Sequence, residues 1–399
     1  MSNNKSILII TQNFYPEEFG INDLALEWAK KNYKVTILTQ TPNYPFDKIY
    51  DGYSNKFIQK EIWKGITVYR VKAKLGSRLS RSNKVLGYLN FTLLSTLFSI
   101  FLIRKFKKIL VYQVGPLTQI IAGIVLRKLF RKELYLWVLD IWPDTVYAYG
   151  FRKSKLNTSI LNYFVKFAYN SCHHIMASNR GFVDKIKKTT KVDVTFIPQW
   201  VPRNLNFVNA SPKKELNGYF NFTFAGNVGM VQNLENLIKG FDKITINERV
   251  RFNIIGDGSN LANLKALVLK NNVKNVFFLG RKPLSEIPNW LVASQVLIIS
   301  LIDQPNFSIT VPAKFQAYLA AQKPIFCCMK GEAVSLVENY ELGLSCDPDN
   351  ILKIKNTFEQ FMNFSEHDLA KFAEKSGNLT ESFYNFYTIE SKMARIIFH

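Results

Sequence analysis

Residues 306–326 read NFSITVPAKFQAYLAAQKPIF and follow a short apolar run of strand length. A polar loop ends in Thr310, Val311 and Pro312. A helix is predicted to start at this proline, because proline lacks the backbone donor that a first helical turn leaves unused. Lys314 follows in the same predicted turn. The free N–H groups of a helix start and a nearby lysine suit an anion, although an ordinary proline-started helix accounts for the same residues.

The composition describes a large globular chain with an uneven charge. It has 399 residues, 47% of them hydrophobic, and a formal net charge of +22. Residues 1–203 hold 32 Lys+Arg against 12 Asp+Glu, a net +20, which leaves a net +2 for the rest. The length predicts two domains, and the charge predicts that the first domain is drawn to an anionic surface, either a membrane or a nucleic acid.

The cysteines and the start of the chain bear on the compartment. Cys172, Cys327, Cys328 and Cys346 form no C-x-x-C pair, so we expect reduced thiols, a cytosolic setting and no bound metal. The first residues, MSNNKSILIIT, lack a long apolar region, and no signal peptide is expected.

Short apolar runs alternate with helical patterns along the whole chain, which predicts doubly wound parallel sheets. Strands are predicted at residues 6–11, 35–39, 66–71, 109–112, 134–138, 174–178 and 194–197, and again at 220–225, 251–255, 275–279, 296–300 and 324–328. Helices of the second series are predicted near 233–245, 260–270, 285–293 and 332–340. The Pro- and Asn-rich stretch 198–218 reads as a linker, so the predicted domains are 1–203 and 204–378, with a C-terminal helix, 379–399, that packs back on the first domain.

Residues 85–103 carry no charge and have the usual length of a membrane span. Lys84 precedes them and Arg104, Lys105, Lys107 and Lys108 follow, while Arg78, Arg81, Arg127, Lys128, Arg131 and Lys132 could extend the basic face. The preferred interpretation is an interfacial helix on anionic lipid, ahead of a buried helix and then a true span. We expect Leu94, Phe98 and Phe101 to contact the membrane.

Two loops of the first domain hold candidate site residues. The segment LWVLDIWPDT, 136–145, places Asp140 at the predicted carboxyl end of a strand, where a carboxylate faces a substrate crevice. Asp144 after Pro143 is explained by helix capping. Gly20 precedes the first predicted helix and could let backbone approach a ligand, or could belong to a plain strand–helix turn.

Glycine loops follow two strands of the second domain. AGNVG contains Gly226, and IGDG contains Asp257 and Gly258. Turn chemistry alone could explain either loop. Together with Lys314 they place three candidate contacts at strand carboxyl ends of one domain. No Ser/His/Asp order, zinc-like cluster, P-loop or dinucleotide fingerprint is present.

These residues resemble those of family-4 retaining glycosyltransferases, whose fold, GT-B, has two Rossmann-like domains with a cleft between them. Within the family the chain looks most like the bacterial L-fucosamine transferases of O-antigen and capsule synthesis, the WbuB type. The resemblance rests on TQNFYPEEFG at 11–20, LTQTPNYP at 38–45, LWVLDIWPDT, FAGNVGMVQNLENLI at 224–238, IIGDGSNL at 254–261 and TVPAKFQAYLAAQKPI at 310–325.

The resemblance implies that the second domain binds a UDP-sugar and needs no cofactor or metal. The phosphates or the sugar would be approached by Gly226, Asn227 and Gln232. It implies that the nucleoside is flanked by Asp257, Gly258 and Arg281. The diphosphate would be held by Thr310, Val311, Pro312 and Lys314.

The first domain would take the acceptor, a sugar on polyprenyl diphosphate, at the cytoplasmic face of the inner membrane. Gly20 would touch the donor, and Asp140 would orient or deprotonate the acceptor hydroxyl. The membrane contact would run through residues 85–108. Since no histidine base is evident, the donor phosphate itself is expected to take the acceptor proton.

The sequence departs from the family at two places. Many members carry Glu-x7-Glu, and these positions are Ile309 and Ala317 here; the usual glycine before the closing proline is Gln322. Two rival functions remain open. A GT-B sugar-nucleotide epimerase would share the donor domain and need no acceptor. A basic nucleic-acid- or membrane-binding protein would use the charge, although an uncharged apolar run between basic clusters suits lipid better than nucleic acid.

Overall fold

The computed structural model describes residues 5–76, 80–148, 153–244 and 249–399. The chain forms two compact units, Met1–Pro198 together with Ile389–His399, and Gln199–Thr388. The predicted boundary after residue 203 therefore falls inside the second unit, whose core buries Leu205 and Leu216. The predicted C-terminal segment also starts too early, because Leu379 and Tyr384 pack in the same core.

The first unit is built on an eight-stranded sheet in the order β3-β4-β2-β1-β5-β6-β7-β8. All described strand pairs of this sheet are parallel except β3 and β4, which form an antiparallel pair. The elements are β1 Ser6–Ile10, α1 Gly20–Lys30, β2 Lys34–Gln40, β3 Ile58–Trp63, β4 Ile66–Val71, α2 Arg81–Ser99, η2 Ile100–Lys105, β5 Lys108–Gln113, η3 Leu117–Gln119, α3 Ile120–Phe130, β6 Glu133–Val138, α4 Asp144–Ala148, α5 Lys155–Asn170, β7 His174–Ala177, α6 Arg180–Lys187 and β8 Val194–Phe196.

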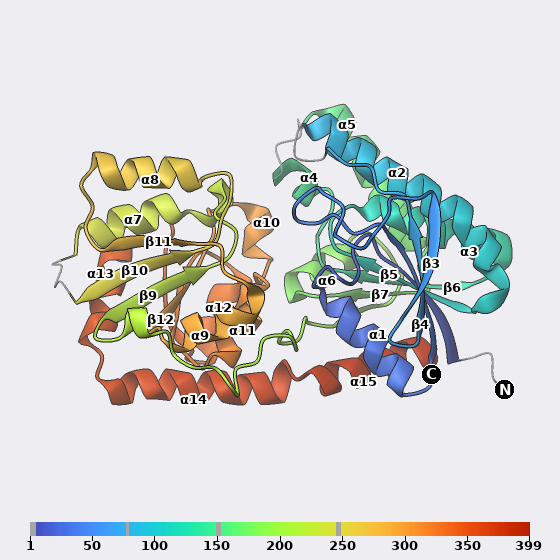
Figure 1. Cartoon of the computed structure of the whole chain (residues 1–399). Helices are drawn as coiled ribbons and strands as arrows, with labels where there is room; N and C mark the ends of the chain where they lie inside the picture. Colours follow the sequence, from blue (N-terminus) through green and yellow to red (C-terminus); the bar gives the residue numbers. More distant parts are fainter. Residues whose placement is uncertain (1–4, 77–79, 149–152, 245–248) are drawn as a thin grey trace. The chain divides into compact units, whose positions relative to one another are not determined.

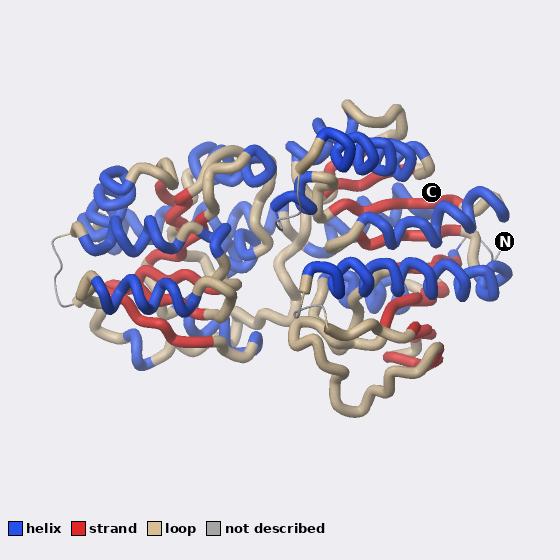
Figure 2. Tube along the Cα trace, turned by 90° about the horizontal axis from the view of Figure 1, so that it is seen from above, coloured by secondary structure: helices blue, strands red, loops and turns tan. Residues whose placement is uncertain are grey.

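Helices cover both faces of this sheet, so its central strands are buried along their whole length, as the continuous apolar run of β1 shows. Helices α2, α3 and α5 lie side by side over one face, with α2 against α3 and α3 against α5 (Figures 1 and 2). On the other face the end of α15, Phe386–Phe398, packs on α1. There the ring of Phe398 stacks on Tyr33 with centroids 4.1 Å apart and meets Trp28 edge-on, while Glu390 pairs with Lys31.

The second unit has a six-stranded sheet, all parallel, in the order β11-β10-β9-β12-β13-β14. The elements are η4 Lys214–Leu216, β9 Phe220–Ala225, η5 Met230–Gln232, α7 Leu234–Asp242, β10 Val250–Ile255, α8 Leu261–Lys270, β11 Val276–Gly280, η6 Leu284–Glu286, α9 Ile287–Val292, β12 Val296–Ser300, α10 Pro305–Ser308, α11 Lys314–Ala320, β13 Ile325–Cys328, α12 Glu332–Asn339, β14 Gly343–Cys346, α13 Ile351–Asn363 and α14 Glu366–Phe383. The predicted doubly wound parallel sheets are confirmed.

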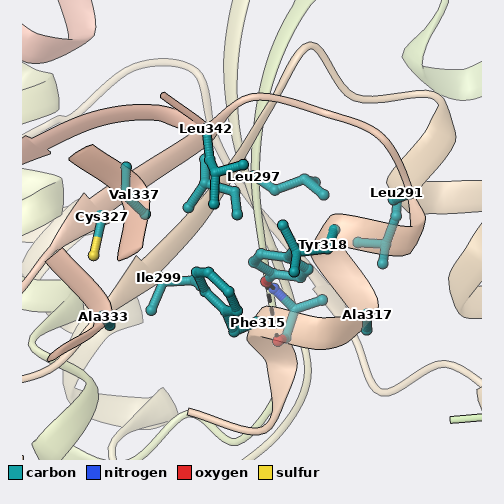
Figure 3. Packing of buried hydrophobic residues seen from close by; sticks show 14 of the residues in the cluster. Leu291, Leu297, Ile299, Phe315, Ala317, Tyr318, Cys327, Ala333, Val337 and Leu342 are labelled. Atoms are coloured by element: carbon teal, nitrogen blue, oxygen red, sulfur yellow. Dashed lines mark hydrogen bonds between the residues drawn. The ribbon is translucent and has the colours of Figure 1, made fainter. Parts of the chain in front are cut away.

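Helix α11 is held in place by its apolar side. Phe315 and Tyr318 are buried among side chains of β12, α9 and α12 (Figure 3). The Tyr318 hydroxyl exchanges hydrogen bonds with the backbone of Ala225 at the end of β9, accepting from its N–H at 2.9 Å and donating to its carbonyl at 3.3 Å. This contact fixes the start of α11 beside the loop that follows β9.

Two strands were not predicted, and both lie at edges. β3, IQKEIW, has three successive polar residues between its apolar ends and is only partly buried, and β14 is a half-buried strand of four residues. Neither provides the continuous apolar run by which the buried strands were recognised.

Candidate active site

The second sheet reverses its order at β9 and β12. From β9 the chain proceeds to β10 and β11 on one side, and β12, β13 and β14 lie on the other. The carboxyl ends of β9 and β12 therefore flank the crevice in which open parallel sheets bind ligands. Gly226 directly follows β9, and the segment after β12 carries Thr310 and leads into Lys314.

The ammonium group of Lys314 lies inside this crevice. Its Nζ is 3.4 Å from the centroid of the Phe224 ring, is shielded from solvent and has no hydrogen-bond partner among the described residues. Burial lowers the pKa of Lys314 from 10.5 to about 7. Burying a charged ammonium group without an anionic partner costs free energy. An anion that binds beside Lys314 would remove this cost and would be strongly attracted to the charge.

Gly226 allows the lysine to reach this position. Its φ is +145°, and a Cβ there would lie 3.0 Å from Lys314 Nζ and 3.3 Å from Cε. Any side chain would therefore be strained in its backbone and would press on the lysine. Gly226 and Lys314 are 88 residues apart in the sequence, and the structure brings them together as predicted.

Asn227 and Gln232 contact each other beside Gly226. Gln232 Oε1 accepts from the Gly229 N–H at 2.9 Å and from Asn227 Nδ2 at 3.4 Å. The amide of Gln232 thus shapes the turn that joins β9 to η5. That it also contacts a donor sugar stays a prediction.

The loop after β10 packs directly against the loop after β9. The Val228 N–H donates to the Asp257 carbonyl at 2.9 Å, and a Cβ on Gly258 would lie 2.4 Å from the Val228 oxygen. This close approach is a structural reason for the glycine. Asp257 and Arg281 are exposed and follow the neighbouring strands β10 and β11; their predicted contact with a nucleoside is untested.

The start of α11 differs in detail from the prediction. The helix begins at Lys314, so Pro312 lies two residues ahead of it and accepts the Phe315 N–H through its carbonyl at 2.9 Å. Thr310 Oγ1 donates to the Asn306 carbonyl at 2.8 Å, and Val311 is buried. Ala317, one of the positions at which the sequence departs from the motif named above, packs in the apolar core (Figure 3).

Asp140 occupies the corresponding edge of the first sheet, where the order reverses between β1 and β5. It follows β6, and its carboxylate accepts the Gly115 N–H, after β5, at 2.6 Å. Burial raises the pKa of Asp140, while the Gly115 hydrogen bond and the charge of Lys84 act against this shift. The helix beginning at Gly20 lies close by, since the carboxylates of Asp140 and Asp23 both act on Tyr112, whose pKa is raised chiefly by burial.

Asp144 lies in the same loop and has a different environment. It begins α4, as its expected capping position suggests, and pairs with Lys185 at 2.5 Å. Its carboxylate therefore serves a local ion pair.

Sequence reasoning missed Glu17, which organises the loops after β1 and β2. This side chain is buried, and it accepts hydrogen bonds from the backbone N–H groups of Phe14, Asn43 and Tyr44 and from Asn13 Nδ2. Burial raises its pKa despite these four donors. A polar residue in a polar loop gives no sequence signal of burial, so only the fold reveals this role.

Replacing Glu17 by Gln is expected to destabilise the first unit by about 1–3 kcal/mol, because one oxygen becomes a donor that faces other donors. The midpoint of denaturant unfolding measures this loss. Asp51→Asn, which changes an exposed carboxylate without an ion-pair partner among the described residues, should leave the midpoint unchanged. An equal stability of the two variants would contradict the role of Glu17.

The helix predicted to contact a membrane is α2. By length and composition the stretch Ser82–Leu102 could span a bilayer, with a mean hydropathy of 1.8, but core helices of soluble proteins meet the same criterion, and 39% of the window is buried. Of the three predicted contact residues, Leu94 is buried and cannot reach a membrane, whereas Phe98 is half-buried and Phe101 is exposed. The exposed apolar side chains of the helix and its extension are Leu86, Leu89, Leu93, Leu97 and Phe101.

The basic residues after this helix also differ from the prediction. Lys108 is buried and pairs with Glu133 at 2.8 Å, and Lys105 donates to the Tyr69 hydroxyl at 2.8 Å. The charge of Lys108 is therefore neutralised inside the first unit, whereas Lys105 is exposed and bonds only a neutral hydroxyl. Arg78 and the side chains of Arg81 and Arg104 lie outside the described residues.

The described residues contain no group of three or more His, Cys, Asp or Glu side chains arranged to hold a metal ion. The four cysteines have free thiols. Cys328 and Cys346, on neighbouring strands, share a hydrogen bond that raises the pKa of Cys328.

The two doubly wound units define the GT-B fold of glycosyltransferases, and solved structures of this class agree with it. Sucrose-phosphate synthase from Thermosynechococcus elongatus superposes with a TM-score of 0.74 at 12% identity over 98% of each chain. HepE from Anabaena, solved in complex with UDP-glucose, gives a TM-score of 0.69 at 12% identity over 98% of this chain and 99% of its own.

Sequence comparison identifies a glycosyltransferase domain in the second half of the chain. Residues 209–376 match the family of glycosyl transferases group 1. The protein named glycosyltransferase WbjE of Pseudomonas aeruginosa is 26% identical over 66% of this chain and 68% of its own. The protein named colanic acid biosynthesis glycosyl transferase WcaI of Escherichia coli K12 is 23% identical over 86% of each.

Proposed function

We propose that this protein is a retaining glycosyltransferase that uses a UDP-sugar. The sugar, N-acetyl-L-fucosamine or a related amino sugar, is transferred to a polyprenyl-diphosphate-linked sugar in bacterial O-antigen or capsule synthesis. The observation that carries the proposal is the buried Lys314 ammonium at the crevice of the second sheet, which lacks an anionic partner among the described residues. A nucleotide diphosphate supplies this anion. The solved complex of HepE with UDP-glucose, on the same fold, supports this choice of donor.

The chemistry needs few side chains in this proposal. The bond between the anomeric carbon and the UDP oxygen breaks, and negative charge grows on the departing diphosphate. Lys314 and the backbone around Gly226 stabilise that charge, which is the main contribution a preorganised site can make. The acceptor oxygen bonds to the anomeric carbon on the same face, and its proton passes to the departing phosphate, either directly or by way of the Asp140 carboxylate.

Asp140 orients the acceptor hydroxyl or takes its proton in this scheme. Its burial raises its pKa, which makes it a stronger base than an exposed aspartate, and the Gly115 N–H holds the carboxylate in one orientation. The first unit then faces the cytoplasmic surface of the inner membrane, where a polyprenyl-linked acceptor resides. The exposed apolar side chains of α2 support this location.

The decisive experiment measures UDP release from a panel of UDP-sugars, with and without a short-chain lipid-diphosphate sugar, and assigns the product anomer by NMR. We expect release only with the acceptor present and a product that keeps the anomeric configuration of the donor. An inverted product would contradict the retaining mechanism. Conversion of the UDP-sugar without acceptor would instead identify an epimerase.

A further inference from the structure

Two loops at the carboxyl edge of the first sheet bring two aromatic rings together at the surface. Phe19 ends the loop after β1, and Tyr44 lies in the loop after the parallel strand β2. Their ring centroids are 5.6 Å apart, and the ring planes are tilted by 51°. Tyr44 is 55% exposed and Phe19 is half-buried, so ring surface remains accessible. We call these two residues the aromatic pair.

The loop that carries Tyr44 is held by a buried carboxylate of the loop that carries Phe19. Glu17 accepts the N–H groups of Asn43 and Tyr44 at 2.8 and 2.7 Å. The Tyr44 carbonyl accepts the hydroxyl of Tyr50 at 2.7 Å. Tyr44 thus enters this network only through backbone atoms, and its ring is not needed for it. The ring is positioned before a ligand arrives, which lowers the entropic cost of binding.

The loop after β1 is anchored on its other side as well. The ring of Tyr15 stacks on Trp63 of β3, with centroids 5.0 Å apart, and the Tyr15 carbonyl accepts from the guanidinium of Arg70. Arg70 is buried and pairs with Glu61 at 2.7 Å. Tyr15 therefore serves to fix the loop, whereas the aromatic pair has no such structural partner to explain its exposure among these anchoring residues.

The aromatic pair lies at the edge of the sheet where the candidate catalytic residue Asp140 is found. Phe19 directly precedes Gly20, the first residue of α1. In the same loop the Gln12 N–H donates to Gln119 Oε1 at 3.1 Å, which joins this loop to η3 after β5. Strands β1 and β5 flank the reversal of strand order, and Asp140 follows the next strand, β6. A ligand on the aromatic pair is thus bound at the crevice of the first sheet.

We propose that the aromatic pair binds a sugar ring of the acceptor by stacking. A sugar ring has a face of C–H groups, which packs on an aromatic ring, and a rim of hydroxyls, which needs polar partners. The half-buried amide side chains of Gln12 and Asn13 lie in the same loop as Phe19 and offer both donors and acceptors. Aromatic surface with a few polar groups is typical of small-molecule sites. An acyl chain would cover these amides without bonding them, which costs free energy.

This inference rests on the proposed function and adds to it the part of the acceptor that the first unit recognises, its sugar. It also gives a role to the stretches TQNFYPEEFG, 11–20, and LTQTPNYP, 38–45, which contain the aromatic pair. The two can fail separately. Binding of a simple glycoside needs no donor and no turnover, and turnover on a lipid-diphosphate sugar does not require that the two rings contact the sugar.

The test is saturation-transfer NMR on the full chain with the methyl glycosides of glucose, galactose, N-acetylglucosamine and N-acetylgalactosamine. At least one glycoside is expected to bind, with the strongest saturation on the C–H protons of one ring face. Tyr44→Leu, which keeps apolar volume but removes the flat ring, should weaken binding by about three- to tenfold, and Phe19→Leu should act in the same direction. Tyr44→Phe keeps the ring and should retain most of the affinity.

The matched control is Tyr163→Leu, which removes a tyrosine that is 77% exposed on α5, away from this edge of the sheet. Its affinity for the glycosides should equal that of the wild type. Equal affinities in Tyr44→Leu and Tyr163→Leu, or no binding of any of the four glycosides, would overturn the proposal. The melting temperature of Tyr44→Leu should be unchanged, because Tyr44 is held through its backbone.

Two further arms separate the sugar from other occupants of the aromatic pair. Octyl glycosides replace the methyl glycosides in the first arm, and a loss of affinity in Tyr44→Leu that appears only with the octyl compounds would assign the rings to an alkyl chain. In the second arm UDP is titrated, and a weaker UDP affinity in Tyr44→Leu would assign them to the donor nucleotide. Either result would overturn the proposal. With a short-chain acceptor, Tyr44→Leu should raise the KM for the acceptor and leave that for the UDP-sugar unchanged.

Discussion

Asp140→Asn is expected to lower turnover by about 10²- to 10⁴-fold, the usual contribution of a positioned general base. The asparagine oxygen can still accept the Gly115 N–H, so the loop should keep its shape. The binding of UDP, which we place in the second unit, should not change. Steady-state kinetics with a short-chain acceptor and a separate UDP titration measure the two effects.

The pH profile gives an independent reading of the same carboxylate. Because burial raises the pKa of Asp140, its basic form is lost at a higher pH than that of an ordinary aspartate. Activity should therefore fall as the pH drops through this raised value, and the acidic limb should disappear in the Asn variant. Asp144→Asn is the control from the same loop, and its turnover should stay within about tenfold of the wild type. Loss of activity in Asp144→Asn alone would reject Asp140 as the acting carboxylate.

Lys314→Met is expected to weaken UDP binding by about ten- to a hundredfold, the equivalent of one charge-assisted hydrogen bond of about 1.5–3 kcal/mol. The catalytic constant should fall as well, because charge on the diphosphate increases towards the transition state. The fold should not suffer, since the ammonium group has no hydrogen bond to lose among the described residues. Thermal unfolding at pH 6, where the lysine is mostly charged, should occur at an equal or higher temperature in the variant.

Binding of UDP should also take up a proton. With its pKa near 7, Lys314 is mostly neutral at pH 8, and a bound diphosphate raises the pKa and recharges the amine. Calorimetric titrations at pH 8, carried out in buffers with different enthalpies of ionisation, measure this proton uptake. Lys323→Met, which removes a half-buried lysine that follows the end of α11, should change neither affinity nor proton uptake. A wild-type protein that binds UDP without proton uptake would mean that the lysine is not the contact.

The sequence predicted the strands that are rich in buried apolar residues. Strands β4, β9 and β12 have the predicted bounds. β12, VLIIS, is a continuous apolar run, as expected of a parallel strand covered on both faces, whereas β4 and β9 carry polar residues among the apolar ones. The edge strands β3 and β14 were missed because half-exposed strands lack that pattern. The predicted boundary after residue 203 lies five residues beyond the division between Pro198 and Gln199. The Pro- and Asn-rich stretch that was interpreted as a linker belongs to the second unit, whose core buries Leu205 and Leu216.

The candidate site, like the fold, could be predicted from the sequence only in part. The sequence indicated Lys314 and Gly226 individually, but their close approach depends on the hydrogen bonds of Tyr318 to Ala225, which no local pattern predicts. Glu17 and the exposed apolar side chains of α5, such as Ile160 and Tyr163, were missed for a related reason. Sequence patterns are interpreted on the assumption that polar side chains are exposed and apolar ones are buried. A buried polar side chain or an exposed apolar one departs from this assumption and is recognised only from the packing of the neighbouring elements.

The return of the last eleven residues to the first unit has a consequence for how the protein is made. Ile389–His399 is synthesised only after the second unit, so the side chains of Trp28 and Tyr33 stay uncovered until Phe398 is available. The first unit therefore cannot complete its core until the second unit has been synthesised, whereas most domains fold as units, the N-terminal one first. A stop codon after residue 388 would leave it permanently open.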